Sequence, residues 1–509
     1  MPPLPLNGRD LTIDNVIEVA RGRRPVAIDD AAADRMRASR SVIEQLVADG
    51  ATVYGVTTGF GDLADVRIDP SQTAELQRNL VRSHAAGVGE PLPVEVVRAM
   101  LVLRANALAV GLSGVRVETV ELLVGMLNAS VHPVVPSRGS LGASGDLAPL
   151  AHMALVLIGE GEATVDGAGP GPGADALGRA RLNPLTLDAK EGLALLNGTQ
   201  MMCGIGALAH HDALRLALSA DVIGAMSLEA MLGTASAFAE ELVVARPHPG
   251  QIASARHLRE LLADSEIGAS HAHSQHRVQD AYSLRCMPQV HGAARDALAE
   301  LERVLRIEIN SATDNPLVFP SGEVISGGNF HGEPLALALD YATMAVTELA
   351  SISERRTARL VDAHLSGLPA FLAERPGVES GLMIAHYTAA AMVNELKTLS
   401  HPSSIDSIPT SANQEDHVSM GATSALHLRD AVDRAEQVLA IEALCAAQGL
   451  DFRAPLRPGP GVAAAHAIIR ARVPHIGADR SPAPDIAAAR ELIHSGDILA
   501  NGATQRAHA

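Results

Sequence analysis

The stretch LALALDYATMAVTELASISERRTARLVDAHLS, residues 335–366, decides the fold class because it contains neither glycine nor proline. Apolar residues recur in it at spacings of three and four: Leu335, Leu339, Ala342, Val346 and Leu349. This spacing lays one apolar stripe along a long helix, and Pro334 suits the first position of that helix. Such a stripe must be buried, so the helix has to pack against others.

Three further segments lack glycine and proline and predict more long helices: residues 293–315, 382–401 and 422–448. We therefore predict a mainly α protein with a central bundle of long antiparallel helices. Residues 1–200 are interrupted by loop sequences, such as VHPVVPSRGSLGASGD at 131–146. They are expected to form a smaller mixed N-terminal lobe, and residues 201–509 the bundle with a helical C-terminal tail.

Composition narrows the class of function. The formal net charge is −18, which disfavours nucleic acid and anionic membranes as partners, since both need a concentrated basic surface. The N-terminus lacks a basic segment followed by an apolar run, and no membrane-spanning segment is expected. Three widely spaced cysteines indicate neither a disulfide framework nor a zinc site. These features favour a cytoplasmic protein that acts on a small molecule.

Small residues gather in GSLGASGDLAPL, residues 139–150, where the chain can bend sharply. A serine hydrolase would also place a serine on a tight turn. Its G-x-S-x-G motif would need glycine at position 146, which is Asp146 here. From these residues alone, an ordinary flexible loop and an exposed reactive serine both remain open.

The longer segment GASGDLAPLAHMALVLIGEGEA, residues 142–163, resembles the signature of the histidine and aromatic amino acid ammonia-lyase family. Further blocks match in family order: VYGVTTGFG at 53–61, NLVRSHAAGVGEP at 79–91, EGLALLNGTQ at 191–200, RPHPGQ at 246–251, VQDAYSLRC at 278–286, TDNPL at 313–317, GGNFHGEP at 327–334, ERRTARL at 354–360 and TSANQEDHVSMG at 410–421. The resemblance thus covers most of the chain.

The resemblance implies an electrophile made from Ala143, Ser144 and Gly145, which cyclise with loss of two waters to a 4-methylidene-imidazol-5-one. The residue types suit that reaction. Gly145 offers an unhindered nitrogen, Ser144 the leaving hydroxyl, and Ala143 little bulk. No coded side chain is an electrophile, so a lyase must make or borrow one, and no external cofactor is expected.

The resemblance also assigns residues that would act on the substrate. Tyr54 is the expected base for the β-proton, and Tyr282 is expected beside the electrophile. Arg285 would clamp the substrate carboxylate through its planar guanidinium. The remaining assignments are binding residues near the carboxylate, the ring or the electrophile: Asn197, Gln279, Asn329, Phe330 and Gln414.

The expected substrate is histidine. The pair Ser83-His84 matches histidine-specific members, and Glu415 adds a carboxylate that suits an imidazole better than a phenyl ring. Gln200 and Asn413 point the same way. The alternatives within the family are a tyrosine ammonia-lyase and a tyrosine 2,3-aminomutase. Four positions depart from the usual residue: Ala281, Met287, Gly332 and His386.

His271, His273 and His276 form a local HxHxxH, but no carboxylate or cysteine neighbour completes a metal site, so no metal is predicted. The resemblance implies a homotetramer whose active sites take residues from more than one subunit. Two other classes remain as alternatives: a serine hydrolase that keeps Ser144 unmodified, and a helical scaffold without activity.

Overall fold

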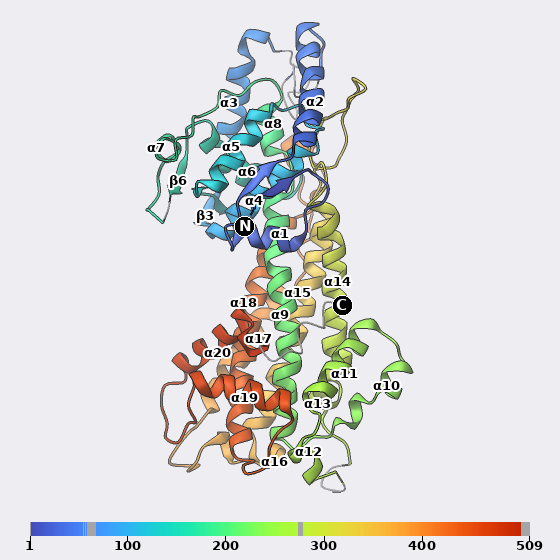
Figure 1. Ribbon diagram of the computed structural model, residues 1–509, viewed down its shortest axis with the longest axis vertical. Coiled ribbons are helices and arrows are strands. Elements are labelled where there is room, and N and C mark those ends of the chain that lie inside the picture. Colours follow the sequence, from blue (N-terminus) through green and yellow to red (C-terminus); the bar gives the residue numbers. More distant parts are fainter. Residues whose placement is uncertain are drawn as a thin grey trace. The chain divides into compact units, whose positions relative to one another are not determined.

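The computed structural model describes residues 2–53, 55, 58, 68–165, 167–272 and 278–499. This part of the chain is mainly helical, which confirms the predicted fold class (Figure 1). It packs as two compact units. Unit 1 comprises Met1–Leu208, Leu301–Asp340 and Pro402–Leu426, and unit 2 comprises Ala209–Glu300, Tyr341–His401 and His427–Ala509.

The first part of unit 1 mixes short strands with helices, as expected for the N-terminal lobe. Its helices are α1 (Ile13–Ala20), α2 (Asp30–Ala48), α3 (Thr73–His84), α4 (Val94–Ala109), α5 (Val117–Asn128), α6 (Leu147–Leu157), α7 (Gly173–Arg179) and α8 (Glu191–Leu196). Its strands are β1 (Leu4–Leu6), β2 (Val26–Ile28), β3 (Val88–Pro91), β4 (Val131–Pro133), β5 (Pro136–Arg138), β6 (Glu162–Val165) and β7 (Gly171–Pro172). Strands β1 and β2 pair in parallel, whereas β3–β5 and β4–β6–β7 pair antiparallel.

Four long helices follow: α9 (Gln200–Ala230), α14 (Met287–Glu308), α15 (Glu333–Val361) and α18 (Gly421–Asp451). Each has residues in both units. Unit 1 therefore includes two segments that lie beyond residue 200 in sequence. The division into 1–200 and 201–509 stays a prediction.

The other helices lie between or after these four: α10 (Glu240–Val244), α11 (Pro249–Leu261), α12 (Glu266–Ser270), α13 (Tyr282–Arg285), α16 (Ala363–Ser366), α17 (Met383–Leu399), α19 (Pro460–Arg472) and α20 (Ala483–Ser495). A hairpin of β8 (Leu317–Val318) and β9 (Val324–Ile325) precedes α15. The short 3-10 helices are η2 (Pro70–Gln72), η3 (Ala235–Phe238), η4 (Ala370–Leu372), η5 (Ser411–Asn413) and η6 (Asp497–Leu499).

The predicted long helices exist, but their ends differ, most of all for the helix predicted over 293–315, which begins earlier and ends at Glu308. The helix predicted over 335–366 ends as α15 at Val361, because the Asp362 side chain accepts the N–H groups of His364 and Leu365 and starts α16. The helix predicted over 293–315 begins earlier, at Met287, since Pro288 is tolerated in a first turn. These differences concern where the helices begin and end, and they do not change the predicted bundle.

Close helix packing depends on glycine at particular positions. In unit 1, a Cβ on Gly206 of α9 would lie 3.0 Å from Leu339 of α15 and 3.4 Å from Leu305 of α14. In unit 2, a Cβ on Gly292 of α14 would lie 2.3 Å from the backbone nitrogen of Gln251 in α11. Helices with small residues at the contact approach more closely, which suits a core with few aromatic residues.

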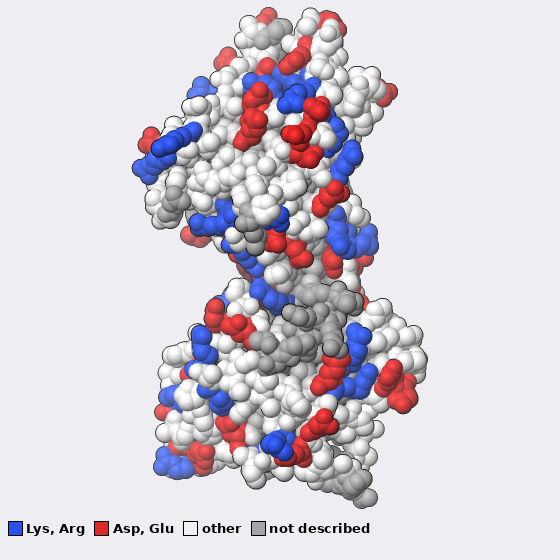
Figure 2. Space-filling view, viewed as in Figure 1, with Lys and Arg blue, Asp and Glu red and all other residues white. Residues whose placement is uncertain are grey.

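Among the described residues, α15 is the one helix long and apolar enough to cross a membrane by length and composition. However, 72% of its apolar window is buried within the protein, as in the core helix of a globular bundle. Acidic and basic side chains are interspersed over the face shown in Figure 2. The three cysteines of the chain, Cys203, Cys286 and Cys445, are unpaired.

Candidate active site

The segment Ala143-Ser144-Gly145 lies in unit 1, in the connection between β5 and α6. Ala143 is buried with Val418 and Met420. Gly145 has φ +71°, and a Cβ there would lie 2.2 Å from the carbonyl oxygen of Gly198. Both the backbone angle and the contact exclude any larger residue, so glycine is required at position 145.

Asp146 fixes the end of this segment. Its Oδ2 accepts the N–H groups of Met201 and Met202, which open α9, at 2.9 and 3.0 Å. Its Oδ1 accepts from the Ser140 hydroxyl at 2.9 Å. Burial raises the pKa of Asp146 to about 6, against the opposing effect of these hydrogen bonds. In the sequence, Asp146 argues against a serine hydrolase, but its structural role is not predicted. The signal for that role is an acidic residue directly after Ala-Ser-Gly.

The local structure fits a ring made from the three residues. The outer two are small and buried, and the glycine has the permissive conformation that a compressed backbone ring needs. The Ser144 hydroxyl donates to Glu415 Oε1 at 3.0 Å, so the group that would leave as water already has a carboxylate acceptor. The residues present therefore fit the implied electrophile.

Glu415 is held by its own loop. Its Oε2 accepts from the Thr410 hydroxyl at 3.1 Å, and the backbones of Thr410 and Glu415 pair in both directions. Between them, Ser411, Ala412 and Asn413 all have positive φ, a region that residues other than glycine rarely adopt. The strained turn thus fixes where the carboxylate lies.

His84 lies within the electrostatic influence of Glu415, at the C-terminal end of α3. Burial lowers the pKa of His84, although the Leu80 carbonyl and Glu415 both act to raise it. Its Nδ1 lies 2.9 Å from the Leu80 carbonyl, which can only accept, so Nδ1 carries the proton. In the neutral ring, Nε2 is then a hydrogen-bond acceptor. Ser83 donates its hydroxyl to the same Leu80 carbonyl at 3.1 Å.

A second loop reaches the electrophile segment through Gly332, whose N–H donates to the Gly142 carbonyl at 3.1 Å. This loop carries Asn329, which donates to the Ala312 carbonyl at 3.4 Å, and the half-buried Phe330. A Cβ on Gly332 would lie 2.6 Å from Met202 Sδ, so this position favours glycine because Met202 fills the space of a side chain.

The two loops also contact each other through histidine. His331 stacks on His417 with the ring planes 4° apart and the centroids 6.0 Å apart. His331 Nε2 donates to the His417 carbonyl at 3.1 Å. The segment after Phe330 is thereby joined to the segment after Glu415.

Asn197 follows α8 and precedes Gly198, which contacts Gly145. Its Nδ2 donates to the Asn315 carbonyl at 3.2 Å, while its buried Oδ1 has no partner in the part of the chain that the structure describes. Gln200 is buried and binds Arg104 and Thr313, at 2.9 Å each. Its role in the structure is therefore to support the segment that carries Asn197.

Three predicted site residues lie in unit 2: Gln279, Tyr282 and Arg285. Tyr282 and Arg285 begin and end α13, and Ala281 is its N-cap. The Arg285 guanidinium lies 4.6 Å from the centre of the Tyr282 ring, a cation–π contact. The Arg285 Nε is buried without a partner among the described residues, so it is a donor open to a ligand.

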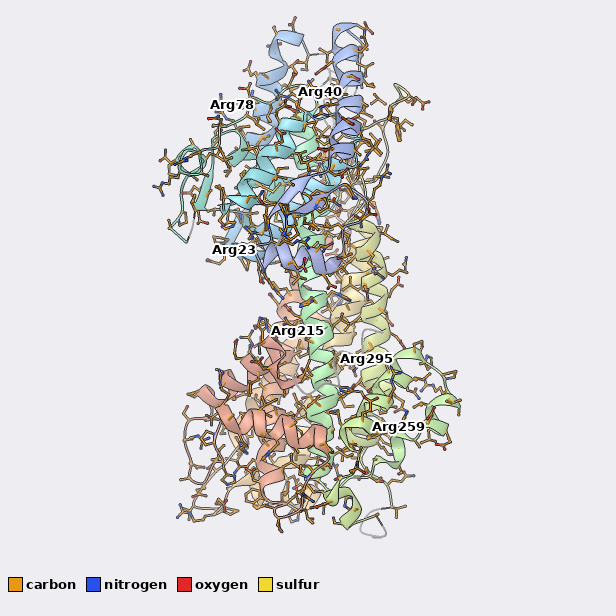
Figure 3. The ribbon with its side chains drawn as sticks, in the orientation of Figure 1. Arg23, Arg40, Arg78, Arg215, Arg259 and Arg295 are labelled. Carbon is orange, nitrogen blue, oxygen red and sulfur yellow. The ribbon has the colours of Figure 1, made fainter. Side chains whose placement is uncertain are left out.

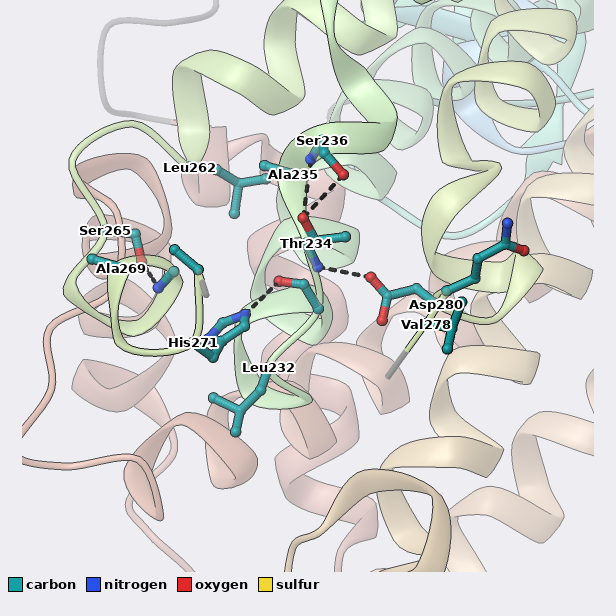
Figure 4. A pocket seen from close by; sticks show the side chains of 14 residues that line it. Leu232, Thr234, Ala235, Ser236, Leu262, Ser265, Ala269, His271, Val278 and Asp280 are labelled. Carbon is teal, nitrogen blue, oxygen red and sulfur yellow. Dashed lines mark hydrogen bonds between the residues drawn. The ribbon is translucent and has the colours of Figure 1, made fainter. Parts of the chain in front are cut away.

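Gln279 lines a cavity of about 480 Å³ in unit 2 (Figure 4). The cavity wall is fixed by polar contacts: the Thr234 N–H donates to Asp280 Oδ2 at 2.7 Å, and His271 Nε2 donates to the Gly233 carbonyl at 3.1 Å. His271 thus binds a backbone carbonyl through Nε2.

The following predicted residues lie in unit 1: Ser83, His84, Ala143, Ser144, Gly145, Asn197, Asn329, Phe330 and Glu415. Glu415 contacts Ser144 and acts electrostatically on His84, and Gly145 pairs with Gly198, which follows Asn197. Gln414 is exposed and follows η5 in the loop of Glu415. Tyr54, His273 and His276 lie outside the described residues. In the described ranges, no set of three His, Cys, Asp or Glu residues is arranged to bind a metal, and the prediction about metal stays a prediction.

Comparison with known proteins points to one family. The family model described as aromatic amino acid lyase matches residues 11–471. A histidine ammonia-lyase of Myxococcus xanthus is 54% identical over 500 residues, covering 98% of both chains.

Solved structures agree with this assignment. A crystal structure of histidine ammonia-lyase from Trypanosoma cruzi superposes with a TM-score of 0.91 at 44% identity, covering 98% of this chain and 94% of that one. A tyrosine aminomutase from Streptomyces globisporus superposes with a TM-score of 0.93 at 39% identity, covering 99% and 98%. One fold therefore serves both reactions, and the site must decide between them.

Proposed function

The chain belongs to the aromatic amino acid lyase family, and from that premise we propose that it is a carbon–nitrogen lyase converting L-histidine to trans-urocanate and ammonia. The observation that carries the proposal is the 54–56% identity to histidine ammonia-lyases over nearly the whole of both chains. Tyrosine ammonia-lyase and tyrosine aminomutase activities are not favoured.

The acceptors around Ser144 support histidine as the substrate. Glu415 offers a carboxylate, and the neutral His84 offers Nε2 as an acceptor. A protonated imidazole has two N–H donors and a positive charge, which would satisfy both. A phenol has one donor and no charge, so it would leave one of these acceptors unpaired at a free-energy cost.

Arg285 and Tyr282 support binding of an amino acid. A guanidinium with an open, buried donor suits a carboxylate, and the aromatic ring beneath it keeps the guanidinium plane in place. Asn197 Oδ1 is an acceptor open to an ammonium group. We assign Tyr54 as the base by its position in the family motif.

The electrophile is assigned to Ala143, Ser144 and Gly145, without an external cofactor. A 4-methylidene-imidazol-5-one at this position supplies an electron-poor methylene that activates the substrate for loss of ammonia. Glu415 orients the Ser144 hydroxyl, Gly198 excludes any side chain at position 145, and Asp146 connects the segment to the start of α9. These contacts keep the three residues in one conformation.

We further propose a cytoplasmic homotetramer whose sites take residues from more than one copy. The support lies on α17, where only Ala385, Ala389 and Leu396 are buried. Ile384 and Tyr387 on the same helix are 54% and 62% exposed. An apolar helix with so small a buried face suits a contact with another copy of the chain. Sedimentation analysis of the purified protein tests the assembly.

The test of function is incubation with histidine, tyrosine and phenylalanine in parallel, following ammonia release and the ultraviolet absorbance of the conjugated acid. We expect histidine to give both signals, with little from the other two. Faster release from tyrosine would contradict the proposed substrate. A β-amino acid product would identify an aminomutase, and absence of ammonia from all three would refute the lyase.

A further inference from the structure

Unit 2 contains a buried polar network formed by side chains of α9, α11 and α14. Asp221 accepts from the Ser254 hydroxyl at 2.7 Å and from His291 Nδ1 at 2.7 Å. It also pairs with His257 at 3.1 Å and with Arg295 at 2.5 Å (Arg295 is labelled in Figure 3). Burial acts to raise the pKa of Asp221, but the Arg295 guanidinium and the hydrogen bonds from His257 and His291 hold it well below its usual range.

The network continues to α15 and α18 through Arg356. Two guanidinium nitrogens of Arg356 bind the Glu442 carboxylate at 2.5 and 2.9 Å, and Ser227 donates to the same carboxylate at 2.6 Å. A third nitrogen, Nη1, donates to His291 Nε2 at 3.3 Å. Arg356, Glu442 and His291 have no exposed surface.

The hydrogen bonds through His291 can be assigned a direction, from Arg356 to Asp221. An arginine only donates, so His291 Nε2 must accept and its proton must lie on Nδ1, which donates to Asp221. Burial lowers the pKa of His291, which agrees with a neutral ring between Arg356 and Asp221. Two carboxylates then balance two guanidinium groups, those of Arg295 and Arg356.

One contact of this network reaches the candidate site. Arg356 Nη1 also donates to the backbone carbonyl of Ser283, at 3.4 Å. Ser283 is the second residue of α13, the single turn that begins at Tyr282 and ends at Arg285. A helix of this length cannot maintain its own geometry and depends on outside contacts.

We propose that Arg356, oriented by Glu442 and His291, is a positioning residue that sets the placement of Tyr282 and Arg285. A buried ion pair adds little net stability compared with apolar residues of the same volume, since desolvation offsets the attraction. The ion pair instead fixes the orientation of the Arg356 guanidinium. Its two bonds to Glu442 hold the guanidinium plane, so its third nitrogen can point in only one direction. Through Arg356, the turn α13 is thus held by contacts that involve the three long helices α14, α15 and α18.

The proposal rests on the proposed function, so its test uses the full-length enzyme and begins with the wild type on histidine. Arg356→Lys keeps the charge but cannot bind Glu442 bidentately and reach Ser283. The matched control is Arg453→Lys, because Arg453 also belongs to unit 2 and donates to the carbonyls of Ala230 and Ser366, neither of which belongs to α13. Thermal melting of each variant reports folding separately.

The decisive measurement compares two competitive ligands. Imidazole propionate carries the carboxylate that Arg285 would bind, and histamine lacks it. In Arg356→Lys we expect at least tenfold weaker binding of imidazole propionate, with histamine changed less than threefold and KM for histidine raised. In Arg453→Lys we expect both affinities unchanged, even if its melting temperature falls as far.

Each other outcome overturns the proposal. Equal losses for both ligands would mean a general structural effect, and unchanged binding of imidazole propionate would mean that Arg356 does not position Arg285. In an Arg285→Lys background, Arg356→Lys should weaken imidazole propionate no further. If the wild type itself releases no ammonia, the proposed function fails, while the ligand comparison still tests the role of Arg356.

Discussion

The Ser144 hydroxyl donates a hydrogen bond of 3.0 Å to the Glu415 carboxylate, although the two residues are 271 positions apart in sequence. The residue expected to lose its hydroxyl and the residue expected to bind the substrate ring are therefore in direct contact. Glu415 can act twice, first on the cyclisation of the segment and later on the substrate. Experiments at this site have to separate the two roles.

Ser144→Ala should abolish ammonia release from histidine, because alanine has no hydroxyl to lose and cannot give the methylidene group. The measurement pairs an activity assay with the mass of the peptide containing residues 143–145. In wild type this peptide should be lighter than its sequence by two water molecules. Wild-type activity in the variant would show that Ser144 is not the source of the electrophile.

Glu415→Gln should lower kcat/KM for histidine by about tenfold to a hundredfold, which corresponds to losing about 1.5–3 kcal/mol from a hydrogen bond to a charged group. Any turnover of tyrosine should fall far less. The mass of the 143–145 peptide distinguishes a failed cyclisation from a binding defect. Glu323→Gln, at an exposed carboxylate of the same unit, is the control. Equal losses of kcat/KM for histidine and tyrosine would mean that Glu415 does not recognise the substrate ring.

Asp146→Asn should change how stability depends on pH. The folded pKa of Asp146 is raised from 3.8 to about 6, so this group favours the folded state most below pH 4, and that contribution is lost as pH rises through about 6. This change in the pKa of Asp146 corresponds to about 3 kcal/mol. Relative to the Asn variant, wild type should become less stable between pH 4 and 6 in denaturant titrations. Asp175→Asn is an exposed control, and parallel pH curves for wild type and Asp146→Asn would contradict the prediction.

Gly332→Ala should destabilise unit 1 by about 1–3 kcal/mol, because the new methyl would lie 2.6 Å from Met202 Sδ and 2.9 Å from Ser419 Oγ. The loop that carries Asn329 and Phe330 would be displaced with it. Adding Met202→Ala should recover part of the loss, since it removes the side chain in the way. Strictly additive losses in a double-mutant cycle would show that the two sites do not compete for space.

The fold class and the family could be predicted from the sequence alone. The apolar stripe at 335–366 and the motif blocks are local patterns, and both can be recognised without knowing the tertiary structure. The sequence also predicts that Ser144 and Glu415 serve one site, and their side chains are in contact. It did not reveal Asp146 as a buried carboxylate, or the link from Arg356 to Ser283. Those contacts depend on which faces of different helices meet, and a linear pattern does not encode this.

Helix ends were also beyond the sequence rules used. The end of α15 depends on whether Asp362 turns its side chain to its own backbone, which is a local competition of small free energies. The early start of α14 depends on Gly292, which meets α11 and would be an unfavourable helix residue in isolation. At Gly292 a tertiary contact outweighs helix propensity, whereas at Asp362 a local side-chain hydrogen bond decides where the helix ends.

Position 145 is under a steric demand that has nothing to do with reactivity, because the carbonyl oxygen of Gly198 fills the place of any side chain. Relatives that lost the chemistry would therefore still keep this glycine. Its presence in a new sequence marks the architecture, whereas the serine before it marks the enzyme. A search for active members should therefore give position 144 more weight than position 145.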